Sequence, residues 1–394
     1  MGNLLNQSFS DLVTEINRLC TLRAADYPAR KQAYHDLYAK VQLLAHRLRQ
    51  EMSPDWQPDA NTIAQAKAMT PIFIGGYYKS GTTFVRDLLD HHDQMSVLPG
   101  DAKLLFNHRK IELLAEKERL AHLQESWIHR LVNPTGLPPF WLFGQEAAPY
   151  RNFLHYLAYW FTQFDTPLLQ DITAPALAYF CANPIHSRQP RYWIDKTPMQ
   201  EMDVDLLYQQ YPEARFIHVV RNPLASLAAR KKMTLQKNGR FNFVGLLPEF
   251  HASLTQGLQL KQSLKERYFI IRYEDILTDP SGSMKNIVAK LNIPFDKSLL
   301  SPTVNGIATT PNSAYQNLRQ QGKIITGSPD RWRAVLTQKE VLHTVDMLGS
   351  LAAAYGYDWQ DISSTSLWGK MTRRLSRLGF YTLRQALSLF RIKS

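Results

Sequence analysis

The chain has 394 residues, 44% of them hydrophobic, so it is long enough to bury one large core with a smaller appended unit. Two cysteines, Cys20 and Cys181, exclude a disulfide framework and lack the spacing of a zinc site, which favours a reducing compartment. The formal charge is +12, but seven basic residues and no acidic residue follow Asp361, and the rest of the chain carries only +5. A mildly basic body fits a small anionic ligand better than a nucleic-acid track, so no nucleic-acid partner is expected.

The first 66 residues are predicted to form a helical segment, because apolar residues recur at helical spacing between residues 8 and 52. The start of the chain lacks the basic region and apolar run of a signal peptide. No run approaches the ~18 uninterrupted apolar residues that indicate a transmembrane helix. We therefore expect a cytoplasmic protein, in which SPDWQPDANT (53–62) links the helices to the next domain.

Residues 67 to 360 are predicted to form an α/β domain. Four apolar runs are typical of strands buried on both faces, and they cover residues 71–75, 191–195, 215–220 and 268–273. Because helical patterns follow each run, we expect a three-layer sandwich around a central, mostly parallel sheet. An aromatic-rich helical insert, residues 105–185, interrupts the alternation. Its aromatic side chains suit either an acceptor-side lid or plain core packing, which is the commoner role for any one of them.

The stretch PIFIGGYYKSGTTFVR, residues 71–86, reads as a buried strand, a tight loop and the start of a helix. Unpaired N–H groups and the helix dipole favour an anion at such a helix start. The loop resembles the phosphate loop G-x-x-x-x-G-K-[ST], but Thr82 stands where that loop has its lysine, and Lys79 lies inside the turn. This change suits a ligand with a shorter anionic tail than a nucleoside triphosphate.

The same loop is similar to the phosphosulfate loop of the PAPS-dependent sulfotransferases, where a basic residue precedes Ser-Gly-Thr-Thr. RFIHVVRNPLAS (215–226) resembles the strand–Arg–x-Pro–helix element of that family, and IDKTP (194–198) and IIRYEDILTDP (270–280) follow in matching order. The resemblance covers about residues 70 to 358. It implies a fold like the P-loop-containing nucleotide hydrolases, 3′-phosphoadenosine 5′-phosphosulfate (PAPS) as co-substrate, no metal, and a hydroxyl-bearing acceptor that is a carbohydrate, lipid or peptide.

The resemblance also implies a donor site made by two separated segments. The residues that would bind the phosphosulfate are Lys79, Ser80, Gly81, Thr82 and Thr83. Arg221 would bind the 3′-phosphate, and Tyr273 resembles a residue near the adenine, although simple packing explains it equally well. The family serine eight residues after the arginine is replaced by Ala229, so either Ser226 or a backbone group substitutes, or the phosphate is held less tightly. Glu274 and Asp275 are expected to cap or orient neighbouring loops.

Sulfuryl transfer needs a cation beside the departing phosphate and a base for the acceptor proton. Lys79 fits the first role. Asp101 is the candidate base, because the tyrosylprotein and bacterial branch of the family has an acid about here, although an alignment without insertion puts that position at Gly100. Asp101 would alternatively cap a helix. Lys103 matches the basic residue that the family has two positions after its acid.

Further candidates are weaker. Lys196 resembles a lysine that contacts the reacting centre in some members, and pairing with Asp195 is its alternative. His91 and His92 are rival bases, but they follow the loop helix, where histidine interacts favourably with the dipole. In GSPDRWR (327–333), two arginines are possible phosphate contacts, Arg331 and Arg333.

The last segment, residues 361–394, interleaves arginines with apolar residues as a basic amphipathic helix does. It is expected either to contact an anionic membrane surface peripherally or to pack on the body. Two rival functions remain. One is an ATP- and magnesium-dependent small-molecule kinase with Asp195 as the metal-holding carboxylate. The presence of Thr82 at the position of the kinase lysine argues against it. The other is a nucleotide-binding adaptor without catalysis.

Overall fold

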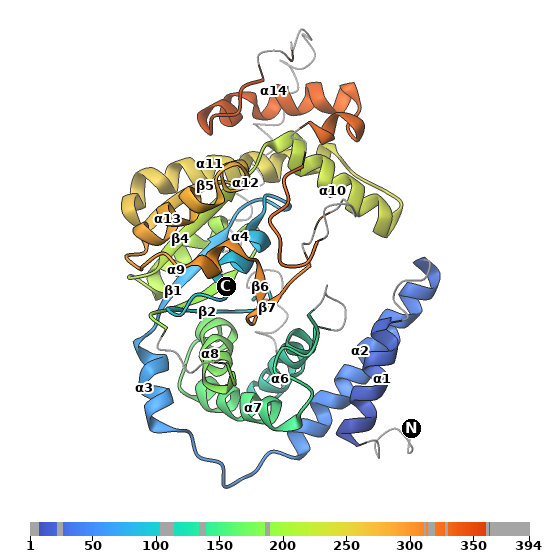
Figure 1. Ribbon diagram of the computed structural model, residues 1–394, viewed down its shortest axis with the longest axis vertical. Coiled ribbons are helices and arrows are strands. Elements are labelled where there is room, and N and C mark those ends of the chain that lie inside the picture. Colours follow the sequence, from blue (N-terminus) through green and yellow to red (C-terminus); the bar gives the residue numbers. More distant parts are fainter. Residues whose placement is uncertain are drawn as a thin grey trace.

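The computed structural model describes residues 8–21, 27–102, 114–133, 139–185, 190–310, 313, 320–327, 330–359 and 362. A five-stranded parallel sheet in the order β2-β3-β1-β4-β5 lies at its centre (Figure 1). The strands are β1 Thr70–Gly75, β2 Met95–Val97, β3 Tyr192–Lys196, β4 Arg215–Val220 and β5 Tyr268–Arg272. The four predicted strands are confirmed as β1, β3, β4 and β5. Strand β2 was not predicted, because three residues are too few to show a period.

Helices cover both faces of the sheet. The helices of this α/β region are α3 Ala60–Ala68, α4 Thr82–Leu89, α9 Val204–Gln210, α10 Pro223–Asn238, α11 Leu247–Leu264, α12 Tyr273–Thr278, α13 Pro280–Lys290 and α14 Gln338–Ala354. Ile72 and Ile74 of β1 point to the face covered by α4 and α13, whereas Phe73 points to the face that α8 (Pro167–Ala182), α9 and α11 cover. The predicted three-layer α/β sandwich is therefore confirmed.

The carboxyl ends of the strands meet at one edge. Ile74 pairs with Lys196, Gly75 with His218, and Val220 with Arg272, so the segments that follow these strands start at a common level. In open parallel sheets, ligands bind outside this edge.

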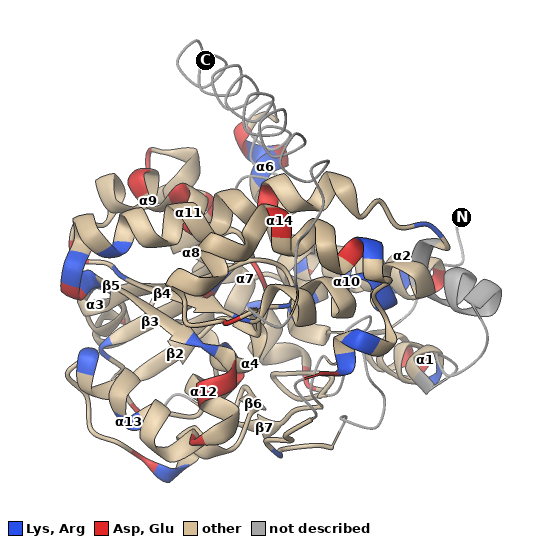
Figure 2. Cartoon of the chain, turned by 90° about the horizontal axis from the view of Figure 1, so that it is seen from above, with Lys and Arg blue, Asp and Glu red and all other residues tan. Residues whose placement is uncertain are grey.

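A third cluster of buried side chains joins α10, α11 and α14 above the sheet. Lys231 of α10 forms an ion pair with Glu340 of α14, with 2.8 Å between Nζ and Oε2. Figure 2 shows basic and acidic positions interspersed on the outer helices of the described chain.

The remaining helices form the lower half of the molecule in Figure 1. They are α1 Phe9–Thr21, α2 Tyr27–Gln50, α6 Glu116–Val132, α7 Ala147–Thr162 and α8. Leu12 and Leu44 share one buried cluster with Trp127 of the insert, so the predicted N-terminal helices and the helical insert pack on each other. The predicted linker is shorter than expected, because α3 begins at Ala60, where the Asp59 carboxylate accepts a hydrogen bond from the Thr62 N–H at 2.7 Å. The division at residue 66 stays a prediction.

A short hairpin joins the two halves. Its strands are β6 Thr303–Val304 and β7 Ile307–Ala308. Asp90, at the end of α4, accepts hydrogen bonds from the Thr303 hydroxyl and the Gly306 N–H, both at 2.8 Å. Asn305 in the turn accepts one from the Tyr179 hydroxyl of α8 at 2.8 Å. The turn at Asn305 therefore connects α4 to α8 of the insert.

The C-terminal tail lies outside the described residues, apart from Ile362. Among the helices that are described, none is long and apolar enough to cross a membrane.

Candidate active site

The loop between β1 and α4 is a turn that leads directly into a helix. The Ser80 N–H donates to the Tyr77 carbonyl at 3.0 Å, and α4 begins at Thr82, as predicted. Gly76 and Gly81 have positive φ, and Lys79 has a φ of +66°. This left-handed conformation costs a residue with a side chain about 1–2 kcal/mol, so surrounding contacts must hold it. The first N–H groups of α4 lie where an anion is favoured.

Tyr273 lies over this loop. It opens α12 directly after β5, and a Cβ atom on Gly81 would collide with its ring. Its ring also meets Phe84 of α4 edge-on, with 5.7 Å between the centroids. The structure thus brings the end of β5 against the turn at Gly81, two regions that lie far apart in the sequence.

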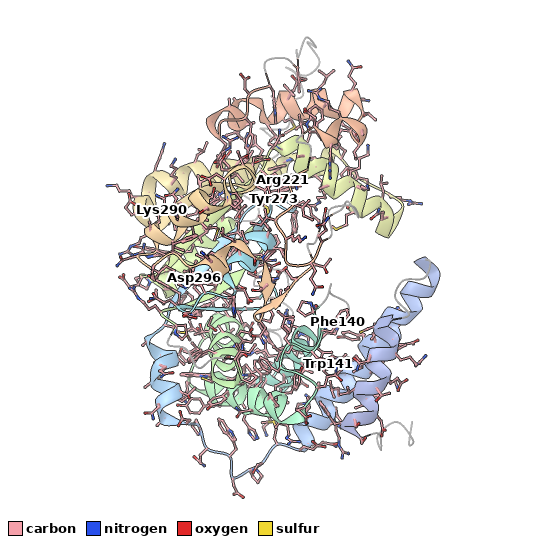
Figure 3. The ribbon with its side chains drawn as sticks, viewed as in Figure 1. Phe140, Trp141, Arg221, Tyr273, Lys290 and Asp296 are labelled. Atoms are coloured by element: carbon pink, nitrogen blue, oxygen red, sulfur yellow. The ribbon has the colours of Figure 1, made fainter. Side chains whose placement is uncertain are left out.

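Arg221 joins the loop from β4. Its Nη1 donates to the carbonyl of Lys79 at 3.2 Å, and its guanidinium lies 4.7 Å from the centre of the Tyr273 ring. Figure 3 shows Arg221 and Tyr273 together at the upper part of the sheet. Arg221 Nε and Ser80 Oγ are buried, and neither has a hydrogen-bond partner within the described chain. Buried polar atoms are normally paired, so these two atoms fit a site that an anionic ligand completes.

Ser226 and Ala229 lie on α10, after Arg221. Ser226 is fully buried, and its hydroxyl lies 3.5 Å from the carbonyl of Lys79. It therefore faces the loop backbone. Ala229 is buried as well and offers no polar group at the position of the family serine.

Glu274 holds the start of α10. Its two carboxylate oxygens accept hydrogen bonds from the Asn222 N–H at 3.0 Å and the Tyr357 hydroxyl at 2.7 Å. The expected orienting role of Glu274 is confirmed. Asp275 instead pairs with Arg272 across 3.8 Å on the surface.

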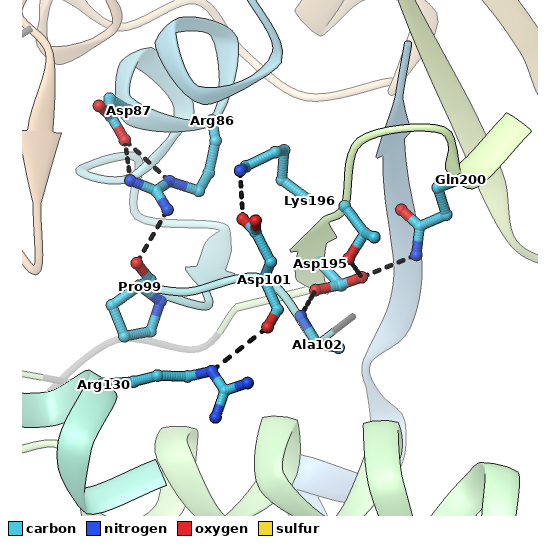
Figure 4. A network of polar contacts seen from close by, with 10 residues as sticks. Arg86, Asp87, Pro99, Asp101, Ala102, Arg130, Asp195, Lys196 and Gln200 are labelled. Atoms are coloured by element: carbon cyan, nitrogen blue, oxygen red, sulfur yellow. Dashed lines mark hydrogen bonds and ion pairs between the residues drawn. The ribbon is translucent and has the colours of Figure 1, made fainter. Parts of the chain in front are cut away.

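Asp101 lies four residues after β2, at the same edge of the sheet. Its Oδ1 accepts a hydrogen bond from the Nζ of Lys196, which ends β3. The Lys196 side chain is 4% exposed and that of Asp101 is 23% exposed, so the carboxylate is the more accessible partner. Figure 4 shows this pair at the centre of a polar network.

Two arginines hold the segment that carries Asp101. Arg86 of α4 is buried beside Asp87 and donates to the Pro99 carbonyl at 2.8 Å. Arg130 of α6 donates through Nε to the carbonyl of Asp101 at 3.2 Å (Figure 4). Burial lowers the pKa of Arg130 and raises that of Asp87 to about 6. Neither arginine was predicted from the sequence, because each looks like an ordinary helix residue.

Asp195 has neither of the two roles considered for it from the sequence, which were pairing with Lys196 and holding magnesium. It does not pair with Lys196; its oxygens accept hydrogen bonds from the Ala102 N–H, the Thr197 hydroxyl and the Gln200 amide, at 3.1, 3.1 and 2.7 Å. It is fully buried, and burial raises its pKa. A carboxyl group in this state orients the neighbouring loops and is poorly suited to hold magnesium.

The two histidines that follow α4 in the sequence have different surroundings. His92 is buried, and its ring nitrogens lie 2.9 Å from the Pro294 carbonyl and 3.1 Å from the Gln94 N–H. Both nitrogens are therefore occupied, which contradicts a role as base. His91 lies against the hairpin turn at Gly306.

The two arginines of the 327–333 segment are also different. Arg333 pairs with Asp330 across 3.3 Å, and both side chains are 60% exposed. Arg331 lies against Gly327. The phosphate role of both arginines stays a prediction.

The aromatic insert is mostly core. The buried aromatic side chains of the insert include Trp127, Trp141, Tyr150, Tyr156, Trp160 and Phe161. Phe140 and Tyr159 are partly exposed. Figure 3 shows Phe140 and Trp141 in the lower half, well below Arg221. Core packing, and not the formation of an acceptor-side lid, is therefore the role of most aromatic side chains in the insert.

Lys103 lies outside the described residues. Among those that are described, no group of three or more His, Cys, Asp or Glu residues could hold a metal ion.

Comparison with known proteins agrees with the motifs. The sequence pattern of the sulfotransferase family matches residues 71–297, more than half of the chain. The match begins at β1 and includes every strand of the sheet.

Two curated relatives share weak identity with the chain. An omega-hydroxy-beta-dihydromenaquinone-9 sulfotransferase of Mycobacterium bovis is 24% identical over 249 residues, which cover 57% of this chain and 63% of the relative. A protein-tyrosine sulfotransferase of Drosophila melanogaster is 23% identical over 239 residues, covering 59% of this chain and 40% of the relative. The chain thus matches less than two thirds of the length of either protein.

Among solved structures, a sulfotransferase of Mycobacterium avium aligns with 90% of this chain and 93% of its own, at 15% identity and a TM-score of 0.44.

Proposed function

This chain belongs to the sulfotransferase family, and on that premise we propose that it transfers a sulfuryl group from PAPS to the hydroxyl of an acceptor. The observation that carries the proposal is the hydrogen bond from Arg221 to the carbonyl of Lys79, at 3.2 Å. It joins the two segments that would bind opposite ends of the donor. The buried atoms Ser80 Oγ and Arg221 Nε, which lack partners in the described structure, support an anionic ligand at this junction.

The donor would bind across the edge of the sheet. Lys79, Ser80, Gly81, Thr82 and Thr83 would hold the phosphosulfate through the ammonium and the backbone N–H groups at the start of α4. Arg221 would bind the 3′-phosphate, and Tyr273 would lie beside the adenine. Ser226 would contribute by holding the carbonyl of Lys79, toward which its hydroxyl points.

The residues around Asp101 suit the transfer step. Asp101 would accept the proton of the acceptor hydroxyl as the new oxygen–sulfur bond forms and the bond between sulfur and the phosphate oxygen breaks. Lys79 would stabilise the negative charge that develops on the departing phosphate. Lys196 would orient the Asp101 carboxylate and lie near the reacting centre. Lys103 remains a further basic candidate.

The acceptor is proposed to be a hydroxyl-bearing carbohydrate, lipid or peptide. The relatives are named for a hydroxylated dihydromenaquinone and for protein tyrosine. We propose cytoplasmic activity with peripheral contact between the tail and anionic lipid. Flotation with anionic vesicles tests that contact: residues 1–366 should bind less than the full chain, and equal binding would remove the tail from the proposal.

Calorimetry tests the donor. We expect PAP, the product nucleotide of PAPS, to bind without magnesium, and Arg221→Ala to weaken its binding about 10- to 100-fold, since a hydrogen bond to a charged group contributes roughly 1.5–3 kcal/mol. Arg267→Ala, which removes a partly exposed arginine just before β5, at the end of the sheet opposite to Arg221, is the matched control and should change nothing. Magnesium-dependent binding of ATP with no response to PAP would overturn the proposal in favour of the kinase. Binding of PAP with no turnover on any acceptor class would favour the adaptor.

A further inference from the structure

Glu201 lies directly behind the loop that carries Lys79. It belongs to the 3₁₀ turn η2 (Gln200–Asp203), which follows β3. Its Oε2 accepts a hydrogen bond from the Gly76 N–H at 2.6 Å, and the side chain is 2% exposed. Gly76 is the first residue after β1, so Glu201 holds the loop at its starting point.

Backbone hydrogen bonds and close packing fix the conformation of the chain at Gly75 and Gly76. The Met199 N–H donates to the Gly76 carbonyl at 2.9 Å, and the Thr197 N–H donates to the Ile74 carbonyl at 3.2 Å. A Cβ atom on Gly75 would lie 2.8 Å from both the N and the Oε2 of Glu201. Glycine at position 75 is therefore required by the approach of Glu201, and the end of β1 is fixed against residues 197–201.

The carboxyl group of Glu201 is buried among neutral groups. Its Oε1 accepts a hydrogen bond from the Ser253 hydroxyl of α11. Burial raises the pKa of Tyr78 of the loop, Tyr268 of β5 and Tyr355 after α14, and the nearby charge of Glu201 raises each of them further. No ion pair to Glu201 is found among the described residues.

Burial shifts the pKa values of Glu201 and of its titratable neighbours in different directions. Burial raises the pKa of Glu201 to about 7. His218 of β4, which accepts or donates a hydrogen bond at the Tyr268 hydroxyl, has its pKa lowered to about 3 by burial. The facing tyrosines stay neutral because their pKa values lie above 10. Burial thus moves the pKa of Glu201 toward physiological pH, while it moves the pKa values of His218 and the tyrosines away from it.

We propose that Glu201 is a positioning residue for donor binding, fixing Gly76 and hence the loop on which Lys79 lies. This inference rests on the proposed function, because it assumes that the loop binds an anionic donor. A bound anion disfavours a second negative charge nearby, so donor binding should draw a proton onto Glu201.

Three proteins test the inference by calorimetry with PAP near pH 7. Glu201→Ala removes the acceptor of the Gly76 N–H and should weaken PAP binding about tenfold, the effect of losing roughly 1.4 kcal/mol. Glu201→Gln keeps an oxygen for Gly76 and should bind PAP within about threefold of the wild type. Titrations in two buffers of different ionisation enthalpy count protons: the wild type should take up more protons than Glu201→Gln.

Glu340→Gln is the matched control, because Glu340 also accepts a backbone N–H, that of Thr337 at 2.7 Å, in the N-terminal cap of α14. It should match the wild type in affinity and proton count. If the wild type fails to bind PAP, the proposed function is wrong. If the wild type binds PAP but Glu201→Ala binds it equally well, only the role of Glu201 is wrong. Should Glu201→Ala not fold, equal proton counts for Glu201→Gln and the wild type would overturn the inference alone.

Discussion

The side chains at the sheet edge and those in the helical lower half of the molecule serve different purposes. At the sheet edge, Lys79, Arg221 and Tyr273 each lie within a few residues of a strand end and converge on one turn. In the lower half, Trp127 and Trp160 are buried among helices that come from both the N-terminal segment and the insert. The difference shows that the strand ends bring polar and aromatic side chains together at one turn, whereas the aromatic side chains of the insert mainly build a core.

Asp101 is the strongest test of this comparison, since it lies on the sheet edge and is held by Arg130 of the insert. We expect Asp101→Asn to lower turnover about 10²- to 10⁴-fold, the usual contribution of a general base. PAP binding should not change, because the amide keeps an oxygen for Lys196. Steady-state rates and calorimetry measure the two effects.

The exposed carboxylate of Asp330 provides the control for that experiment, as Asp330→Asn should leave turnover intact. Undiminished turnover in Asp101→Asn would exclude Asp101 as the base.

Trp127 tests the other half of the comparison. The side chain is 2% exposed in the core that α6 shares with α1 and α2. Trp127→Ala should destabilise the fold by about 3–5 kcal/mol, as truncation of a large buried aromatic usually does. Thermal unfolding should show this as a lower Tm, and PAP affinity below that Tm should equal that of the wild type. A folded Trp127→Ala protein with weakened PAP binding would mean that the lower half contributes to the donor site.

The smallest expected effect concerns the missing family serine. Ala229 is buried on α10, two turns after Arg221. If the 3′-phosphate lies beside Arg221, a hydroxyl at this position should strengthen PAP binding by roughly 1 kcal/mol, or about fivefold. Titration of Ala229→Ser with PAP measures the change. Weaker or unchanged binding would place the phosphate away from this face of α10.

The meeting of Lys79 and Arg221 at one edge of the sheet could be predicted from the sequence, because both residues belong to short continuous motifs. Each stands at a fixed position between an apolar run and a helix, and this pattern indicates which strand and helix hold it. The central strands were predictable for the same reason. By contrast, β2 has three residues and no readable period, although it carries the segment leading to Asp101.

The supporting residues could not be predicted, because their partners are distant. Arg130 contacts Asp101 across 29 positions in the chain, and Glu201 contacts Gly76 across 125. Neither residue belongs to a motif, and each looks like an ordinary polar side chain of a helix or turn. Only the packing of α6 and η2 against the sheet edge gives them a role, and a single sequence carries no signal for such packing.

The hairpin turn at Asn305 has a consequence for how the chain unfolds. Asp90 anchors one side of the turn to α4, while Tyr179 anchors the other side to α8 of the insert. Neither half can separate without breaking these hydrogen bonds, which lie across the junction and exclude a freely swinging hinge there. Heating should therefore melt the sheet and the insert in one cooperative step, even though their side chains serve different purposes.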